Sequence, residues 1–509
     1  MDHYLLINIK GTPILRIKSP VWLHMKLLLL PLQKFQMKPI KINYMKKSFL
    51  LGLLLSTCII AQAGGLMTNT NYHIAFDRMM ARGASFDIDA IFSNPAGLAW
   101  GHEGWQLSFN FQKPWQYRDI KNNGVLYEGK ASAPIVPAVF ASYKKDRWAI
   151  STMIGIVGSG GFVEYKNGVP MFNALIANTI TQLTGGLSQA VGGAIPVITP
   201  DQYNFDSSMK GKQYIYGGQL NFTYKFTDSF AGAVGFRANY YDGYYRGHVI
   251  AGNHPSKGTL AQLMLDVDQK GWGFTPIVSL NFHKGPLTLA ARYEFRTKIS
   301  TKNDTNVLNA ELNTNGMVTE PLTQLVIGGK ITAEQAAAIG KNIQEKMAGG
   351  FDAYTAPYQD GVRTRYDMPA LLTFAVGYEF TKKLRATLEY HFFDDKNAKM
   401  ANDRQKELKH GTHEFLAGIE YDINDKFTIS CGGQRTDYGL SDGYEQDTSF
   451  ACDSYSVGLG GAWNINQKIR LNAGYFCSIY SDYEKAASFG TEIFSRTNHV
   501  IGVGIDFKF

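Results

Sequence analysis

Several features that define other protein classes are scarce in this chain. It has only four cysteines in 509 residues, and three of them, Cys431, Cys452 and Cys477, follow residue 63. A small, odd number of cysteines argues against a disulfide framework. The eleven histidines form no His-Glu-x-x-His pattern, and no Ser/His or paired-acid arrangement stands out. The sequence therefore predicts no enzyme, no cofactor and no metal site.

Long apolar runs and an excess of one charge are also missing from most of the chain. After residue 63 no apolar run is long enough for a membrane helix. The formal net charge is +8, but residues 1–63 hold nine basic residues and one acidic residue, which leaves 42 of each sign in the remainder. Without a basic patch, we expect no nucleic-acid partner.

Residues 45–63 have the three marks of an export signal. They begin with two lysines, continue with a short apolar run and end on a small-x-small cleavage site at 61–63. Residues 1–44 lie upstream of this complete signal, so we interpret them as an over-extended reading frame, with translation starting at Met45. Export without a helical anchor predicts the periplasm, the outer membrane or the cell exterior.

The last residues of the chain alternate with a period of two. From Ile501 to Phe509 every odd position is large and apolar, whereas the positions between are small or polar. This pattern predicts a β-strand with one apolar face. Thirteen earlier segments read the same way, which gives an even total of fourteen, as bacterial barrels require. They are 105–112, 139–143, 148–157, 216–226, 230–241, 272–282, 287–296, 369–380, 384–393, 415–422, 426–435, 454–464 and 468–480.

The connections between these segments alternate in length. Those after even-numbered segments have two to four residues, whereas those after odd-numbered segments have about fifteen to seventy. Outer-membrane barrels show this asymmetry, with short periplasmic turns and long outer loops. The sequence thus predicts an all-β fold, a 14-stranded antiparallel transmembrane β-barrel over 104–509. Its longest outer loops are 159–211 and 297–368, and each contains a helix-like apolar stripe, at 171–187 and 334–347.

Charged residues fall on the faces that point into the predicted lumen, where acids and bases can face each other or water. On the lipid side each charge would cost roughly 2–4 kcal/mol near the midplane. We interpret these residues as bracing for whatever fills the barrel. They are Arg237, Arg292, Glu294, Arg385, Glu389, Glu414, Glu420, Arg470 and Asp506.

The segment 64–103 is too long for a leader and too short for a domain. It contains the stretch RGASFDIDAIFSNPAGLA, in which small residues flank apolar ones. The dipeptide Asn94-Pro95 favours a turn, because proline restricts the residue before it to extended conformations. A fourteen-strand barrel has room for more than side chains. We therefore expect this segment to fill the lumen as an N-terminal hatch, or plug.

This segment resembles the hatch of the FadL/TodX family of outer-membrane transporters for long-chain fatty acids and other hydrophobic compounds. The matching features are the hatch motif Asn94, Pro95 and Ala96 and the strand opening at 367–370. The resemblance implies capture of ligand in an outer apolar groove formed by loop helices. It further implies transfer to an inner pocket, gating by the hatch, and sideways exit at a kinked third strand. It also implies that Phe509 is the signal read by the barrel-assembly machinery.

The resemblance leads to specific candidates for the ligand path. Along the hatch and near the third strand these are Met79, Met80, Phe86, Ile91, Phe92 and Met153. Glycines suited to a kink or bulge in and after the third strand are Gly155, Gly158, Gly160 and Gly161. Hatch packing is the alternative role for the first set.

The predicted function is passive transport of hydrophobic molecules, with long-chain fatty acids as the leading ligand. The expected partners are those molecules and outer-membrane lipids, and we expect a monomer. A general diffusion porin for small polar solutes is the main alternative. An outer-membrane enzyme and an adhesin are weaker alternatives, and a TonB-coupled receptor would need a larger plug and more strands. Fatty acids, aromatic hydrocarbons and other apolar ligands all fit the sequence.

Overall fold

The computed structural model describes residues 65–132, 135–487 and 489–509. The predicted upstream segment, 1–44, and the predicted signal peptide, 45–63, lie outside the described residues. Along the part of the chain that the structure describes, no helix is long and apolar enough to cross a membrane.

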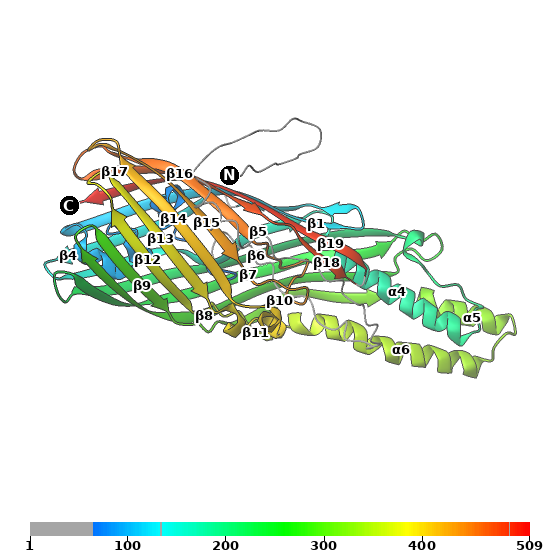
Figure 1. Cartoon of the computed structure of the whole chain (residues 1–509). Coiled ribbons are helices and arrows are strands. Elements are labelled where there is room, and N and C mark those ends of the chain that lie inside the picture. Colours follow the sequence, from blue (N-terminus) through cyan, green and yellow to red (C-terminus); the bar gives the residue numbers. More distant parts are fainter. Residues whose placement is uncertain (1–64, 133–134, 488) are drawn as a thin grey trace, which may run out of the picture. The chain divides into compact units, whose positions relative to one another are not determined.

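Fourteen antiparallel strands form a closed barrel, as the alternation predicts (Figure 1). Each strand pairs with the next along the chain, β9 pairs with β12, β17 pairs with β19, and β1 pairs with β19 to close the wall. The strands are β1 (Gly104–Asn122), β4 (Val136–Lys145), β5 (Trp148–Tyr165), β6 (Asn204–Lys225), β7 (Phe230–Gly252), β8 (Ala261–Lys284), β9 (Leu287–Glu294), β12 (Leu371–Glu379), β13 (Leu384–Phe393), β14 (Thr412–Asp422), β15 (Phe427–Asp437), β16 (Ser454–Asn464), β17 (Ile469–Tyr480) and β19 (Gly490–Lys508).

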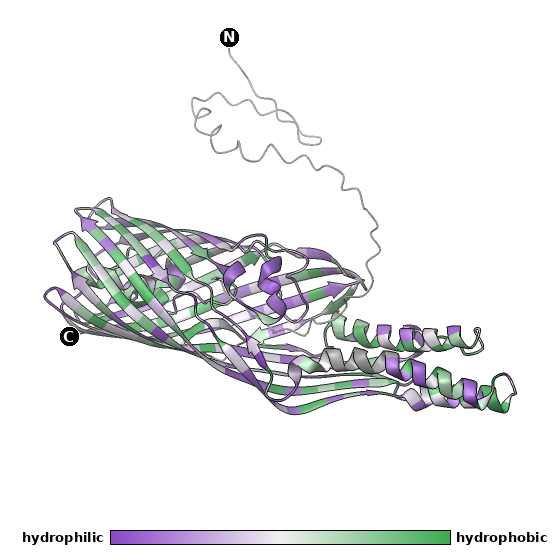
Figure 2. Ribbon diagram, turned by 90° about the horizontal axis from the view of Figure 1, so that it is seen from below, coloured by the Kyte–Doolittle hydropathy of each residue, from purple (hydrophilic) through white to green (hydrophobic). Residues whose placement is uncertain are grey.

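The outside of the barrel is apolar and its inside is polar. On β19 the side chains of Ile501 and Val503 are about half exposed, whereas Asn498 is fully buried. Figure 2 shows hydrophobic and hydrophilic residues alternating along the barrel strands. Exposed aromatic residues form a girdle near the short turns, as membrane barrels require. They are Trp105, Phe226, Phe230, Phe380, Phe427 and Trp463.

Three neighbouring strands, β6, β7 and β8, continue far beyond the length that a bilayer needs. They have 22, 23 and 24 residues, whereas about 9–11 residues cross a membrane. β10 (Ser300–Leu312) pairs with the outer half of β8. Helices α4 (Pro170–Ala190), α5 (Glu320–Ile327) and α6 (Ala333–Thr355) gather at this end, and α4 contacts β7 and β8 (Figure 1). The short strands β2 (Val125–Tyr127), β3 (Gly129–Ser132), β11 (Arg363–Arg365) and β18 (Tyr483–Ala487) lie in outer connections.

The strand extension differs from the sequence prediction, which ended one strand at Tyr241 and began the next at Trp272. The structure continues both, and only residues 253–260 connect them. The apolar face changes sides at the paired residues Tyr240 and Trp272, whose ring centroids lie 4.8 Å apart. Below this pair Phe236 faces outward, whereas above it Val249 faces inward. When the apolar residues switch from one face of a strand to the other, the period-2 pattern in the sequence breaks off. The sequence alone therefore does not show that the strand continues.

The two long outer connections also begin and end with strand. Within 159–211, β5 continues to residue 165 and β6 starts at residue 204, so α4 and its flanks occupy the middle. Within 297–368, β10 precedes α5 and α6. The helix-like stripes at 171–187 and 334–347 fall inside α4 and α6.

Candidate functional site

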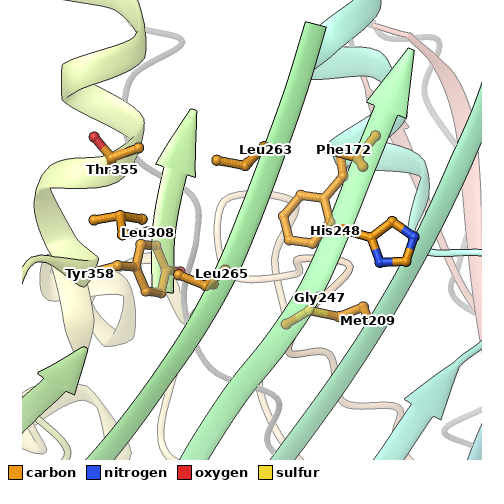
Figure 3. Close-up of a pocket in the computed structure, with 10 residues that line it drawn as sticks. Phe172, Met209, Gly247, His248, Leu263, Leu265, Leu308, Thr355 and Tyr358 are labelled. Atoms are coloured by element: carbon orange, nitrogen blue, oxygen red, sulfur yellow. The ribbon is translucent and has the colours of Figure 1, made fainter. Parts of the chain in front are cut away.

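An apolar pocket lies between the outer helices and the inner face of the strand extension. Its cavity is small, with a volume of about 20 Å³. Phe172 of α4 closes one side, and Leu263 and Leu265 of β8 form the floor (Figure 3). None of its lining residues is a lysine or an arginine. The full lining is Phe172, Met209, Gly247, His248, Val249, Leu263, Leu265, Leu308, Thr355 and Tyr358. We call this the outer pocket.

A second apolar region lies deeper, between the hatch and the barrel wall. Hatch residues Ile91 and Phe92 pack in one buried cluster with Met153 of β5. Leu66 and Met67, at the start of the described chain, belong to the same cluster. We call this the inner cluster. It brings together three of the six predicted ligand-path residues.

The other three candidates lie elsewhere. Met80 packs in a separate small cluster with Phe76 and Leu416. Phe86 stacks near the short-turn end, with its ring centroid 4.9 Å from that of His283. Met79 and Phe86 line a polar cavity of about 230 Å³ at that end of the barrel. Of the six predicted ligand-path residues, four thus lie in apolar clusters and two line the polar cavity.

The hatch motif docks on the wall formed by β6 and β8. The Asn94 amide donates to the Leu280 carbonyl at 3.2 Å, and the Ala96 N–H donates to the Ser279 hydroxyl at 3.0 Å. The Thr223 hydroxyl donates to the Pro95 carbonyl at 2.9 Å. Pro95 also starts a 3-10 helix, Pro95–Trp100, which Asn94 caps by accepting from the Ala96 N–H.

The aromatic ring of Phe92 packs against two arginines, Arg237 of β7 and Arg292 of β9. The guanidinium carbons of Arg237 and Arg292 lie 4.9 and 5.5 Å from its centroid. Arg292 also donates to the Phe92 carbonyl. Arg237 is fully buried and pairs through two nitrogens with Glu294, at 2.8 and 2.9 Å. The cation–π contacts and the hydrogen bond from Arg292 hold the hatch to the barrel, and Glu294 fixes Arg237 in place for this contact.

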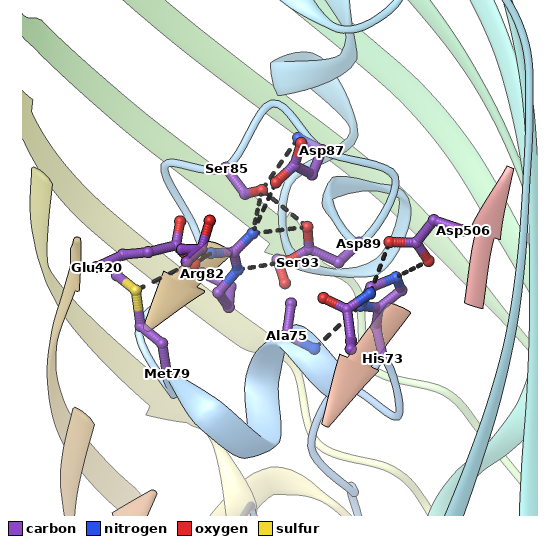
Figure 4. Close-up of polar contacts among 12 residues, drawn as sticks. His73, Ala75, Met79, Arg82, Ser85, Asp87, Asp89, Ser93, Glu420 and Asp506 are labelled. Carbon is purple, nitrogen blue, oxygen red and sulfur yellow. Dashed lines mark hydrogen bonds and ion pairs between the residues drawn. The ribbon is translucent and has the colours of Figure 1, made fainter. Parts of the chain in front are cut away.

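The opposite side of the hatch is fastened to β14 and β19 (Figure 4). His73 contacts Asp506 at 3.1 Å, and Arg78 pairs with Glu420. Arg82 makes two hydrogen bonds to Asp89, of 2.7 and 2.9 Å, which brace the hatch internally. Burial disfavours the charged form of Arg82, but the nearby carboxylates outweigh this and raise its pKa. The hatch is therefore held at both walls.

The four predicted kink glycines lie in the outer part of β5, where its pairing with β6 is irregular. The register shifts between Ile156 and Gly158 and again between Gly158 and Gly161. Gly161 has φ +98°, which favours glycine. Gly160 falls between the paired positions, and Gly155 keeps regular register. These shifts form a bulge that separates β5 from β6 locally.

Sequence reasoning missed two features that lie beside these sites. The first is the segment 65–70, whose Asn69 N–H donates to the Val157 carbonyl at 3.0 Å beside the bulge. The second is the connection 438–453 between β15 and β16, which we call the mouth loop. Its stretch 444–452 is buried throughout. Polar composition favoured an exposed loop, and no periodicity in the sequence indicates that it folds inward.

The mouth loop contributes residues to two buried apolar clusters. Phe450 packs in the buried cluster that includes α4 and Phe172, whereas Tyr444 packs in the inner cluster. Arg404 holds the loop by donating to Gln446 and Ser449. The loop therefore connects the cluster around α4 with the inner cluster.

The chain ends on the rim with the short turns. The Phe509 N–H donates to the Trp105 carbonyl at 2.9 Å, and the Phe509 side chain is 60% exposed. Its ring stacks on that of Phe507. The role of Phe509 as an assembly signal stays a prediction.

Comparisons with known proteins complete the description. No protein-family model and no curated protein matches the chain. Among solved structures, a Pseudomonas aeruginosa FadL homologue matches with a TM-score of 0.57 and 13% identity, over 89% of this chain and 99% of that one. The Pseudomonas putida toluene transporter TodX matches with a TM-score of 0.51 and 13% identity, over 89% of this chain and 100% of that one. This chain has the FadL-type fold.

At 13% identity the likeness concerns the FadL-type fold, so the ligand has to be argued from this chain's own residues. The fold agrees with the apolar exterior and the aromatic girdle described above. Together they identify a multi-pass β-barrel of the Gram-negative outer membrane.

Proposed function

We propose that this protein carries hydrophobic molecules passively across the outer membrane, with long-chain fatty acids as its main ligand. The observation that carries the proposal is the pair of apolar sites, the outer pocket and the inner cluster, and the mouth loop contributes residues to the clusters around both. In this scheme the outer pocket captures the ligand and the inner cluster receives it. The ligand then leaves sideways at the β5 bulge into the lipid.

Burial of apolar surface supplies the driving force for capture. Each methylene that moves from water into the outer pocket contributes roughly 0.8 kcal/mol. Transfer to the inner cluster exchanges one apolar environment for another, so it needs no energy source. Exit into lipid also exchanges one apolar environment for another, so it needs no energy source either. The pocket is narrow, so capture requires α4 to shift outward as the ligand enters.

The N-terminal segment 65–70 is the part of the hatch best suited to gating. The rest of the hatch is fastened to both walls, by the ion pair of Arg78 with Glu420 on one side and by the contacts of Phe92 with Arg237 and Arg292 on the other. Segment 65–70 touches the bulge through backbone contacts of Thr68 and Asn69. Its displacement by a ligand would shift the population toward an open path at little cost to the barrel.

A direct test measures uptake of labelled palmitate by vesicles that contain the purified protein. A variant with the hatch motif replaced, Asn94→Gly with Pro95→Gly and Ala96→Gly, should change the uptake rate. Uptake equal to that of the wild type would contradict hatch gating. If even the wild-type vesicles take up no more palmitate than protein-free vesicles, the proposed transport itself is wrong.

Single-channel conductance separates this proposal from a general diffusion porin. Hatch and mouth loop fill the lumen, so the protein should pass almost no ion current. Large steady openings would favour a porin for polar solutes. The same proposal holds that the protein is a monomer and that the barrel-assembly machinery folds it.

A further inference from the structure

A row of three cations crosses the outer face of the strand extension. Lys302 of β10 is the direct cross-strand partner of Lys270 of β8 on one side and of Arg363 of β11 on the other. The three strands lie side by side (Figure 1), and all three side chains are exposed. We call these residues the cation row. Like charges in directly opposed positions destabilise a sheet, so a row of three favours an anionic partner outside the protein.

The carboxylates beside the cation row are already bound to other cations. On β7, Asp242 lies opposite Lys270 but forms an ion pair with Lys212 at 2.8 Å. On β8, Asp268 lies two positions beyond Lys270 and forms an ion pair with Arg246 at 3.3 Å. In the part of the chain that the structure describes, no side chain of the cation row forms a hydrogen bond or an ion pair. These three charges are therefore open to a partner.

Lys298 extends the cation row toward the membrane. It is exposed, and its carbonyl oxygen lies 2.9 Å from the position that a β-carbon on Gly273 of β8 would take. Two acids near the row, Asp304 and Asp360, form no ion pair among the described residues. We call the row together with Lys298 the cation patch. Its four cations outnumber these two acids, so the patch has an excess of positive charge.

The cation patch lies at the height of the lipid head groups. Trp272 of β8 is 61% exposed and marks the level at which the outward face of the strands changes from apolar to polar. Lys270 follows two residues further out, about 7 Å along the strand. Exposed aromatic residues of membrane barrels sit at the boundary between hydrocarbon and water. The next layer outward holds the phosphate and sugar groups of the outer leaflet, and basic clusters beside a membrane bind anionic head groups.

We propose that the cation patch binds the phosphate groups of the glycolipid that forms the outer leaflet. Neighbouring strands lie about 4.8 Å apart, so two cations of the row can contact one phosphate. Lysine and arginine both donate charge-assisted hydrogen bonds to phosphate oxygens. The exposed rings of Trp272 and Phe274 lie below the patch, where they contact the acyl chains of the same lipid. This partner surrounds the barrel and is distinct from the molecule that the protein carries.

The test compares two glycolipids that differ only in their phosphates. One is lipid A with both phosphates, and the other is the same lipid A after enzymatic removal of both. Equilibrium binding of each to the full-length protein is measured in an uncharged detergent. The wild type should bind the phosphorylated lipid at least tenfold more tightly than the other. A variant that combines Lys270→Gln, Lys302→Gln and Arg363→Gln should lose this preference.

The matched control removes the same number of cations from the opposite rim of the barrel. It combines Lys382→Gln, Lys383→Gln and Lys426→Gln, which lie exposed at the short turns. This control should keep the preference for the phosphorylated lipid. Equal losses in both triple variants would show that net charge rather than the cation patch attracts the lipid, and the proposed site would be wrong.

Two further results would overturn the inference. One is equal binding of both glycolipids by the wild type, and the other is an undiminished preference in the cation-row variant. Heat-modified gel mobility checks that each variant folds. Should the triple variant fail to fold, Lys302→Gln alone decides, because it removes the central cation and should lower the preference at least threefold. Palmitate uptake is a separate measurement, so failure of this lipid site leaves the transport proposal standing.

Discussion

Thr68 and Gly158 form an isolated antiparallel bridge inside the barrel, at the place where β5 loses its register with β6. The backbone groups that the bulge frees from the ladder would otherwise be buried without partners, which is costly. Segment 65–70 satisfies part of this demand, because the Asn69 N–H donates to the Val157 carbonyl. The hatch and the wall thus meet through backbone contacts at the proposed exit.

Gly158→Val should displace segment 65–70 and change transport. A β-carbon at Gly158 would lie 2.5 Å from the Met67 carbonyl oxygen, so the segment has to move. We expect a several-fold faster uptake of labelled palmitate into vesicles that contain the variant. Gly155→Ala is the matched control, because its β-carbon would meet nothing closer than 3.4 Å. Equal uptake by Gly158→Val and the wild type would contradict gating by this segment.

Phe172→Ser should weaken capture at the outer pocket. Loss of a buried phenylalanine side chain removes roughly 1.5–3 kcal/mol of apolar contact. We therefore expect uptake to need about tenfold more ligand to reach half its maximal rate, with the maximal rate little changed. The measurement is the uptake rate as a function of palmitate concentration.

Ile327→Ser provides the control for this experiment. Ile327 ends α5 and is 73% exposed, outside the residues that line the pocket. Its substitution should leave the concentration dependence unchanged. Comparable effects of both substitutions would show that the outer helices act as a whole rather than through the pocket.

Glu294→Gln should destabilise the barrel strongly. The substitution leaves the fully buried Arg237 without its counter-charge, which costs about 3–5 kcal/mol in comparable pairs. Asp266→Asn breaks the exposed pair with Arg246 and should cost about 0–1 kcal/mol. The free energy of unfolding in denaturant, followed by tryptophan fluorescence in lipid vesicles, compares the two. A similar loss for both variants would contradict the role of the buried pair.

Glu445 should make the stability of the protein depend on pH. Burial raises its pKa from 4.5 to about 8 in the folded state. Between these values the folded protein holds a proton that the unfolded chain has released, so stability falls as pH rises through this window. Thermal unfolding from pH 5 to 9 measures the effect. Glu445→Gln should flatten the profile, and an unchanged slope would show that other groups cause it.

The membrane part of the fold could be predicted because lipid outside and water inside impose a strict alternation on every strand. Parity alone also places Arg496 in the lumen, since it shares the even positions of β19 with Asp506. The alternation along β19 does not show which residue of β1 lies opposite Arg496. The register with β1, which sets Arg118 beside Arg496, depends on how the barrel closes between its first and last strands.

The outer part of the fold could not be predicted in the same way. Beyond Tyr240 and Trp272 the solvent lies outside the sheet and the helices lie inside, so the same strand presents the opposite pattern. The mouth loop is stabilised by Arg404, a residue of another connection, through contacts more than forty positions apart. Contacts between residues so far apart cannot be predicted from the local sequence. The residues of the outer pocket likewise come from seven separate elements.

The reversal at Tyr240 and Trp272 marks the height of the outer pocket above the membrane. Val249 and Leu263 of the outer pocket lie nine residues beyond that pair along their strands, and a strand rises about 3.3 Å per residue. Even with the strands tilted, roughly 20 Å separate the pocket from the edge of the hydrocarbon. In the proposed scheme the outer pocket therefore takes up an apolar compound beyond the polar layer that covers the outer leaflet, so the compound does not have to dissolve in that layer.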